Sequence, residues 1–415
     1  MVDVSNKKTG EPDVVVLSVV IPAYNEQDGI AEIVGRVLAV RPALLKARVG
    51  RLELIVVDDG SADRTADIVA ALAQVDADVR LVRHQSNRGY GAALKTGFGA
   101  ARGELMAFLD ADGTYPPEHF PDLCRSALDG GELVVGSRRS GAKSEMPFVR
   151  RLGNFLWSNL VTLLCRQRVV DPASGMRVFR REVMERLYPL PDGLNFTPVM
   201  SVRAVHEGVR LVEIPIPYKE RVGRSKLNVV QDGIRFLQTI LWTALSYNPV
   251  RLLGGVGVGL CALCALIAVV LVGVRLAGVT TLGPLGIVSV FVAVVAGIAG
   301  IDLFALGVTF NYLVSLFHQR PIRQGLFGRP LFRTPLDRQF WWIGLLGQGV
   351  GFIFGLVSVA LAWNGWAIER LWLYLVAGTM MILVGVQLDI FWVIVRVLDE
   401  LSKREAMVQA DMECK

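Results

Sequence analysis

The chain is poor in cysteine, and its few cysteines are not spaced as a disulfide framework would require. It contains 5 cysteines in 415 residues. Cys261 and Cys264 form a Cys-x-x-Cys pair, but the pair lies in an apolar stretch without a second pair or a histidine partner. We therefore interpret these two cysteines as small apolar fillers rather than as metal ligands or a redox centre.

Long basic runs and a hydrophobic leader are also absent. The net charge is a modest +6, and no basic run alternates with aromatic residues, which argues against nucleic acid as the partner. A membrane surface or an anionic substrate fits this small excess better. Residues 1–13 are polar, contain no signal-peptide core and are predicted to be disordered, so we expect the N-terminal half to remain in the cytosol.

The C-terminal part is rich in apolar residues. Four segments, about 252–274, 285–314, 342–363 and 371–395, are long enough to cross a hydrocarbon core, which takes ~20 residues. The predicted organisation is an N-terminal domain at 14–227, a juxtamembrane helix at 228–250, a four-helix transmembrane domain at 251–396 and a cytoplasmic tail at 397–415. The helix at 228–247 is amphipathic and is predicted to lie in the membrane interface.

Membrane topology follows from the arginines. The loop 318–341 contains five arginines against one acid, Asp337. The positive-inside rule places this loop, the N-terminal domain and the tail on the cytoplasmic side, with four crossings. Asp302 and Asp389 lie inside predicted spans, where a charge is costly, so each should face protein or water. Hydrogen bonding between helices and a role near the lipid headgroup are both open.

The N-terminal part alternates strands with helices. Strands are predicted at 14–21, 52–57, 79–82, 105–109, 133–135, 176–179 and 211–216, and helices at 27–40, 63–73, 91–101, 117–128, 149–164 and 181–187. This alternation predicts an α/β domain with a mainly parallel sheet covered on both faces. Such sheets bind ligands beyond the carboxyl ends of their strands.

Two carboxylates follow the fourth predicted strand, in the sequence Asp110-Ala111-Asp112. If the strand continued, both side chains would share a face and could reach one Mg²⁺ or Mn²⁺. Such an ion suits a diphosphate, whose negative charge it would neutralise. The simpler alternative is a pair of capping acids in a turn.

Several motifs in order resemble family 2 glycosyltransferases with the GT-A fold, a Rossmann-like α/β fold. They are Pro22-Ala23-Tyr24-Asn25-Glu26, Val57-Asp58-Asp59-Gly60-Ser61, Asn87-Arg88-Gly89-Tyr90-Gly91 and Asp110-Ala111-Asp112. Within that family, Asp171–Arg177 and Arg221–Lys226 are similar to dolichyl-phosphate mannose synthases and bacterial polyprenyl-phosphate glucosyltransferases. The resemblance covers about residues 14–250.

The resemblance implies roles for individual residues. The donor nucleotide would contact Pro22, Tyr24, Glu26, Asp58, Gly89, Asp110 and Ala111. The metal would be held by Asp110, Asp112 and Thr114, the last standing where mannose synthases usually have glutamine. The acceptor phosphate would contact Arg138, Ser174, Arg177, Arg221, Ser225 and Lys226. The catalytic group would be Asp110, Asp112, Arg138, Arg221 and Lys226.

The implied reaction is an inverting transfer of one hexose, mannose or glucose, from GDP-mannose or UDP-glucose to a polyprenyl phosphate such as dolichyl or undecaprenyl phosphate. A phosphate acceptor is already anionic near neutral pH and needs cations rather than a base. The alternative acceptor is a hydroxyl of diacylglycerol or a growing glycan, which would need a base, and Asp171 is one candidate. A remote alternative is a carrier of lipid-linked sugar that uses Asp302 and Asp389. The oligomeric state, including a homo-oligomer, is left open.

Overall fold

The computed structural model describes residues 14–139, 168–218, 229–279, 283–317 and 336–413, together with isolated positions between 151 and 162. The chain divides into two compact units, residues 1–243 and 244–415. Three predicted segments lie wholly or largely outside the described residues. They are the N-terminal segment 1–13, the helix at 149–164 and the arginine-rich loop at 318–341.

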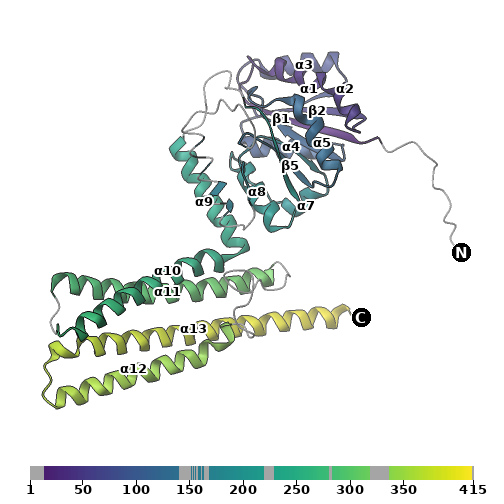
Figure 1. Ribbon diagram of the computed structural model, residues 1–415. Helices are drawn as coiled ribbons and strands as arrows, with labels where there is room; N and C mark the ends of the chain where they lie inside the picture. The colour runs from purple at the N-terminus through teal and green to yellow at the C-terminus, as the bar shows by residue number, and fades with distance from the viewer. Residues whose placement is uncertain are drawn as a thin grey trace. The chain divides into compact units, whose positions relative to one another are not determined.

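The first unit is built on a seven-stranded sheet (Figure 1). Its strands are β1 Val16–Ala23, β2 Arg51–Asp58, β3 Val79–Arg83, β4 Leu105–Leu109, β5 Leu133–Ser137, β6 Met176–Arg180 and β7 Leu211–Pro215. They lie in the order β3-β2-β1-β4-β6-β5-β7, and only β6 runs antiparallel to its neighbours. The predicted mainly parallel sheet is therefore confirmed.

Helices cover both faces of this sheet because alternate side chains of each strand point to opposite faces. Val19 of β1 packs into a core with α1 Ile30–Ala39, α2 Arg41–Lys46, α3 Thr65–Val75 and α5 Phe120–Leu128. The next residue, Val20, packs into a second core with α4 Tyr90–Ala100, α7 Val183–Leu187 and α8 Phe196–His206. The nearly continuous apolar sequence of β1 follows from this burial on both sides.

The predicted strands are confirmed to within about two residues, whereas some helices differ. The helix expected at 27–40 begins at Ile30, and the chain turns at Val40 before α2. The short 3₁₀ helix η1 at Pro117–His119 precedes α5. Helix α8 was not predicted at all, because nine of its eleven residues are buried and the helix therefore lacks an amphipathic pattern.

Helix α9, Val229–Tyr247, follows the sheet domain. Its Thr239 hydroxyl accepts a hydrogen bond from the Asn195 side-chain amide at 3.1 Å, and Ile240 is fully buried. Elsewhere on the helix, the apolar side chains of Ile234, Leu237 and Trp242 are exposed. The helix is thus amphipathic, with one side packed and another side apolar and uncovered.

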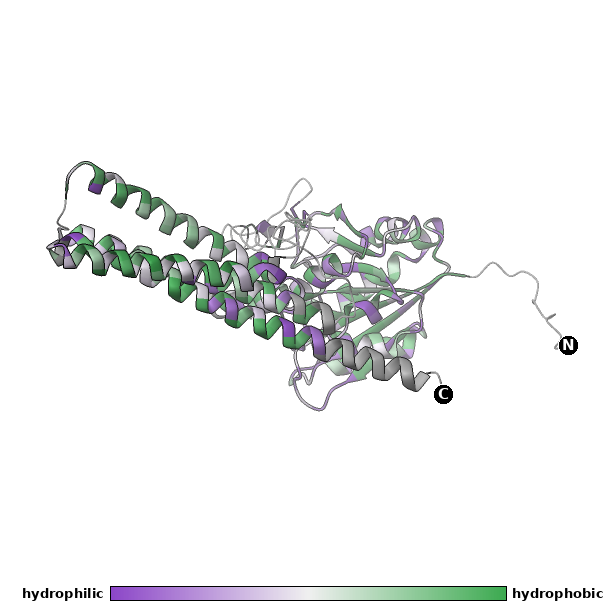
Figure 2. Cartoon of the chain, turned by 90° about the horizontal axis from the view of Figure 1, so that it is seen from below, coloured by the Kyte–Doolittle hydropathy of each residue, from purple (hydrophilic) through white to green (hydrophobic). Residues whose placement is uncertain are grey.

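The second unit consists of four long helices, α10 Pro249–Leu276, α11 Pro284–Phe317, α12 Phe340–Trp363 and α13 Ile368–Glu413, preceded at α12 by the short η2 Leu336–Gln339. All four long helices have the length and apolar composition to cross a membrane (Figure 2). The last apolar segment, expected at about 371–395, lies within α13, which continues to Glu413 and includes most of residues 397–415.

Glycines let these helices approach closely. A Cβ on Gly257 of α10 would lie 2.5 Å from the Gly300 carbonyl oxygen of α11, and a Cβ on Gly385 of α13 would lie 2.5 Å from the Gly344 carbonyl oxygen of α12. Small residues at such contacts are typical of helix packing in membranes, where burial of apolar side chains supplies no driving force.

Candidate active site

The predicted donor-binding segments meet at one edge of the sheet. The parallel strands β1 and β2 end at Ala23 and Asp58, which are register partners, and β4 ends beside them at Leu109. The loops that follow β1 and β2 are joined by hydrogen bonds. The amide of Asn25 donates to the Ser61 hydroxyl at 2.9 Å, and the amide of Glu26 donates to the Thr65 hydroxyl at 2.9 Å. Pro22 and Ala111 are buried here, whereas Tyr24 is 38% exposed.

Asp58 carries an acceptor atom without a hydrogen-bond partner. Its side chain is fully buried, and one carboxylate oxygen accepts from the amide of Ser61 at 3.3 Å. The other oxygen has no hydrogen-bond partner, and Nε of Arg83 lies 3.6 Å from it. A buried carboxylate oxygen without a hydrogen-bond donor is costly, so this oxygen is a candidate to accept an N–H from a ligand.

Asp59 organises the loop that leads into α4. Its carboxylate lies 2.6 Å from Nδ1 of His84 and accepts from the amides of Arg88 at 2.9 Å and Gly89 at 2.8 Å. Gly89 has φ +103°, a conformation that favours glycine. The first amides of α4 are occupied as well, because Gly91 and Ala92 donate to the carbonyl of Asp192 at 2.7 and 3.1 Å. This helix start is therefore closed by protein rather than open to a phosphate.

Asp110 and Asp112 lie in a turn, and the expectation that they share the face of a continuing strand is wrong because β4 ends at Leu109. Asp112 accepts from the amide and hydroxyl of Thr114 at 3.2 and 2.6 Å. Thr114 itself is 1% exposed, so its hydroxyl serves Asp112 in this structure. Asp110 accepts from the hydroxyl of Tyr90 at 2.7 Å.

The donor set at this turn fits a hard divalent cation. Both carboxylates are partly exposed at the rim, and carboxylate oxygens are ligands that Mg²⁺ and Mn²⁺ prefer. Within the part of the chain that the structure describes, no group of three or more His, Cys, Asp or Glu side chains could hold a metal by itself. An ion here would therefore take its remaining ligands from water and from the phosphates of a substrate, as Mg²⁺ commonly does.

Arg138 is held in a largely buried polar cluster. Its guanidinium pairs with Asp171 through Nε at 2.7 Å and Nη2 at 2.6 Å, and it stacks on the rings of Tyr115 and Tyr218 at 5.6 and 5.5 Å. Burial alone would lower the pKa of Arg138, but the adjacent Asp171 outweighs it and raises the pKa, so the charge is permanent. Asp171 is fully buried, and Glu213 in turn accepts from its backbone amide at 2.9 Å.

Ser174 and Arg177, both predicted to bind the acceptor phosphate, are fully buried. The Ser174 hydroxyl donates to the Gly136 carbonyl at 2.6 Å. Arg177 donates to the carbonyls of Ser174, Pro172 and Thr197 at 3.2, 2.7 and 3.0 Å. Burial lowers the pKa of Arg177 to about 10. Both side chains donate to main-chain carbonyls, while Nη1 of Arg177 has no hydrogen-bond partner, and their assignment to an acceptor phosphate stays a prediction.

The other predicted acceptor residues, Arg221, Ser225 and Lys226, lie outside the described residues. Conversely, sequence reasoning assigned no role to several residues that build the site. Tyr90 was named only as part of the motif Asn87–Gly91 and was given no role of its own. Tyr115, Tyr218 and Glu213 had no local signal, because their partners are far away in the chain.

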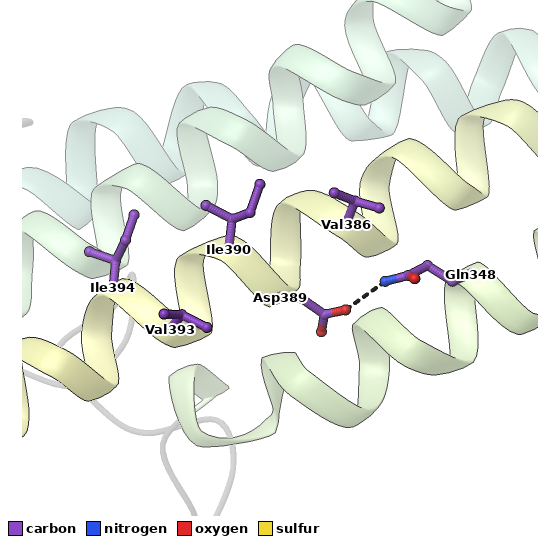
Figure 3. Close-up of a pocket in the computed structure, with 6 residues that line it drawn as sticks. All are labelled: Gln348, Val386, Asp389, Ile390, Val393 and Ile394. Carbon is purple, nitrogen blue, oxygen red and sulfur yellow. Dashed lines mark hydrogen bonds between the residues drawn. The ribbon is translucent and has the colours of Figure 1, made fainter.

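A shallow pocket lies within the helical unit, between α12 and α13 (Figure 3). Its lining residues are Gln348, Val386, Asp389, Ile390, Val393 and Ile394. The side-chain amide of Gln348 donates to Asp389 at 2.5 Å, and that of Gln387 donates to Asp302 of α11 at 3.0 Å. The predicted hydrogen bonding of both aspartates between helices is confirmed.

The doubly covered sheet, with paired aspartates and a buried carboxylate at its carboxyl edge, defines a GT-A domain. Residues 18–188 match the model of "Glycosyl transferase family 2", and residues 249–409 match "Domain of unknown function (DUF8752)". The chain is 33% identical over 249 residues to an undecaprenyl-phosphate 4-deoxy-4-formamido-L-arabinose transferase of Edwardsiella ictaluri, a match that covers 57% of this chain and 73% of the relative.

Two further proteins are similar over about half of the chain. A dolichyl-phosphate hexose transferase of Haloferax volcanii is 29% identical over 230 residues, covering 55% of this chain and 94% of the relative. Glucosyl-3-phosphoglycerate synthase of Mycobacterium tuberculosis, crystallised with UDP, aligns with TM-score 0.44 and 22% identity over 55% of this chain and 80% of that one. The chain belongs to glycosyl transferase family 2 and is a glycosyltransferase.

Proposed function

We propose that this enzyme transfers one hexose from a nucleotide-diphosphate sugar, GDP-mannose or UDP-glucose, to a polyprenyl phosphate at the cytoplasmic membrane face, with inversion. The proposal rests on the observation that one chain combines paired carboxylates at the edge of a GT-A sheet with four helices of membrane-crossing length. The names of the two relatives, both polyprenyl-phosphate sugar transferases, support it.

On the donor side, Asp58 is proposed to accept an N–H of the nucleobase with its unpartnered oxygen. Tyr24, Glu26 and Gly89 would frame the base and ribose from the adjoining loops. Asp110 and Asp112 would hold Mg²⁺ or Mn²⁺, and the bound ion would neutralise charge that develops on the leaving diphosphate. The side chain of Thr114 would contribute by orienting Asp112.

On the acceptor side, the structure disfavours Asp171 as a base. Its carboxylate is fully buried and accepts three hydrogen bonds from Arg138. This weakens the hydroxyl-acceptor alternative, which needs a group that can deprotonate the hydroxyl. A phosphate acceptor needs only cations and in-line placement. We assign that task to Arg221 and Lys226, with Arg138 as a further fixed positive charge.

The membrane orientation rests on charge and on α9. The arginine-rich loop 318–341 favours the cytoplasmic side for the catalytic unit. The exposed Ile234, Leu237 and Trp242 of α9 suit insertion at the headgroup level, and α9 ends only one residue before α10. Both features support our proposal that the catalytic unit lies at the cytoplasmic membrane surface.

The test is an assay of the full-length chain in detergent with short-chain polyprenyl phosphate, Mn²⁺ and a panel of labelled nucleotide sugars. We expect label in the organic phase with one donor, and its loss with EDTA and in Asp112→Ala. A useful control is Asp122→Ala, which removes a half-exposed carboxylate on α5, away from the site. Nucleotide release without lipid product from any donor would contradict the phosphate acceptor and favour a hydroxyl acceptor.

A further inference from the structure

The Asp110 carboxylate is contacted by groups from two other parts of the fold. On one side the Tyr90 hydroxyl donates to its Oδ1 at 2.7 Å. On another side lies the backbone of Gly175, so close that a Cβ there would come within 2.1–2.6 Å of the carboxylate atoms. The carboxylate therefore has little freedom to rotate, and its orientation is set by residues 20 and 65 positions away in the chain.

Tyr90 is itself fixed on both sides along the chain. The two amides that precede it, of Arg88 and Gly89, donate to Asp59 at 2.9 and 2.8 Å. The two amides that follow it, of Gly91 and Ala92, donate to the carbonyl of Asp192. The backbone at Tyr90 is therefore held on both sides and its ring packs against the core, which limits how far the hydroxyl can follow Asp110.

Gly175 is fixed in the same manner. Its amide donates to the Tyr115 hydroxyl at 2.7 Å, and Tyr115 is 2% exposed and stacks on Arg138. Both neighbours of Asp110, Tyr90 and Gly175, are thus held in place by buried parts of the fold. Metal-binding carboxylates in proteins are commonly oriented by such outer hydrogen bonds, and removal of one typically costs about 10–100-fold in metal affinity or activity.

We propose that Tyr90 is a positioning residue, whose hydroxyl orients Asp110 for the divalent ion. The inference rests on the proposed function, in which Asp110 and Asp112 hold that ion. Tyr90 does not touch the ion or the substrate in this role, and its effect passes through the carboxylate. The hydroxyl, not the ring, supplies the effect, because the ring packs against the core that contains Phe98.

The test is Mn²⁺ binding to the full-length chain in detergent with UDP or GDP present. Binding is measured from the electron paramagnetic resonance signal of the free ion. We expect Tyr90→Phe to weaken Mn²⁺ binding by about 10–100-fold while the melting temperature stays near that of the wild type. Phe98→Leu is the matched control on the same helix. It removes packing against Phe108 and Phe179 and should lower the melting temperature without changing Mn²⁺ affinity.

Failures of the two proposals can be told apart. If the wild type shows no Mn²⁺ binding beyond that of Asp112→Ala, the proposed metal site is wrong and the role of Tyr90 falls with it. If the wild type binds Mn²⁺ and Tyr90→Phe binds it equally well, the metal site stands and the positioning role is overturned. An equal loss of affinity in Phe98→Leu would also overturn it, since general destabilisation would then explain the effect.

Discussion

Arg138 and Asp171 lie 33 residues apart in the chain and form a bidentate ion pair, with Nε–Oδ2 at 2.7 Å and Nη2–Oδ1 at 2.6 Å. The aspartate is fully buried, and the arginine side chain is 13% exposed. Removal of one partner of a buried pair leaves an uncompensated charge, which typically costs about 3–5 kcal/mol. Loss of either partner is therefore expected to destabilise the fold around this pair.

Asp171→Ala should consequently lower the melting temperature strongly, and Asp171→Asn should lower it less because the amide oxygen still accepts from Arg138. Thermal unfolding of both variants in detergent measures this. A variant Asp171→Asn that melts like the wild type but has lost all transfer activity would contradict the structural role and would restore Asp171 as a candidate base.

Asp58→Asn should weaken donor binding. The substitution puts an NH₂ group in place of one carboxylate oxygen, so the acceptor that the ligand N–H is expected to use is lost or its charge is removed. A hydrogen bond to a charged group contributes about 1.5–3 kcal/mol, which corresponds to about 10–100-fold in affinity. The measurement is the dissociation constant of the nucleoside diphosphate by calorimetry. Asp67→Asn, at an exposed position of α3, is the control, and equal affinities for all three proteins would refute the assignment.

Gly175→Ala should abolish most of the transfer activity. The new methyl would lie 2.1 Å from a carboxylate oxygen of Asp110, so that carboxylate must move. Gly99→Ala in α4 provides the comparison, because nothing lies within 4 Å of its Cβ position. That control should keep its activity and gain up to about 1 kcal/mol in stability, since alanine favours a helix over glycine. Activity of Gly175→Ala near the wild-type level would show that Asp110 is free to move.

Glu53 should make the stability of the fold depend on pH in the acidic range. Burial alone would raise its pKa, but hydrogen bonds from Ser18, the amide of Arg102 and Arg80 outweigh it and lower the pKa below 4.5. Because the folded pKa is below the unfolded value, the ionised carboxylate contributes stability that is complete above pH 4.5 and is lost as the pH falls through the folded pKa.

Melting temperatures of wild type and Glu53→Gln should therefore differ near pH 7 and converge below pH 4.5. Glu104→Gln, at an exposed position, should follow the wild type throughout. A difference between wild type and Glu53→Gln that stays constant across this range would show that the carboxylate charge does not contribute.

Asp389→Leu should loosen α12 from α13. It removes the acceptor of the Gln348 hydrogen bond, and such bonds between membrane helices contribute about 0.6 kcal/mol on average and about 1.7 at most. Unfolding of the full-length chain in mixed micelles measures the loss. Ile390→Leu, at the next position of the same helix, is the control. A carrier function for Asp389 would instead appear as lost movement of a preformed lipid-linked sugar with unchanged stability.

The sequence by itself determined the class of the fold and the place of the site. Buried parallel strands must be apolar along their length, so β1, β2 and β4 could be recognised from local composition. Asp58, Asp110 and Asp112 could be located because ligands gather at the carboxyl ends of such strands. The four long apolar helices could be found because only such segments match the hydrocarbon core.

Only the tertiary structure decided what surrounds those residues. Helix α8 is buried on nearly every side, so its sequence carries no helical periodicity. Arg177 was predicted to contact the acceptor phosphate, and only the fold shows that it is fully buried, with main-chain carbonyls accepting from its Nε and Nη2. The contacts of Tyr90 and Gly175 with Asp110 bring together three segments that are far apart in the chain. Local sequence records neither burial nor the long-range pairing that brings such groups together, because both arise only when the sheet and its helices assemble.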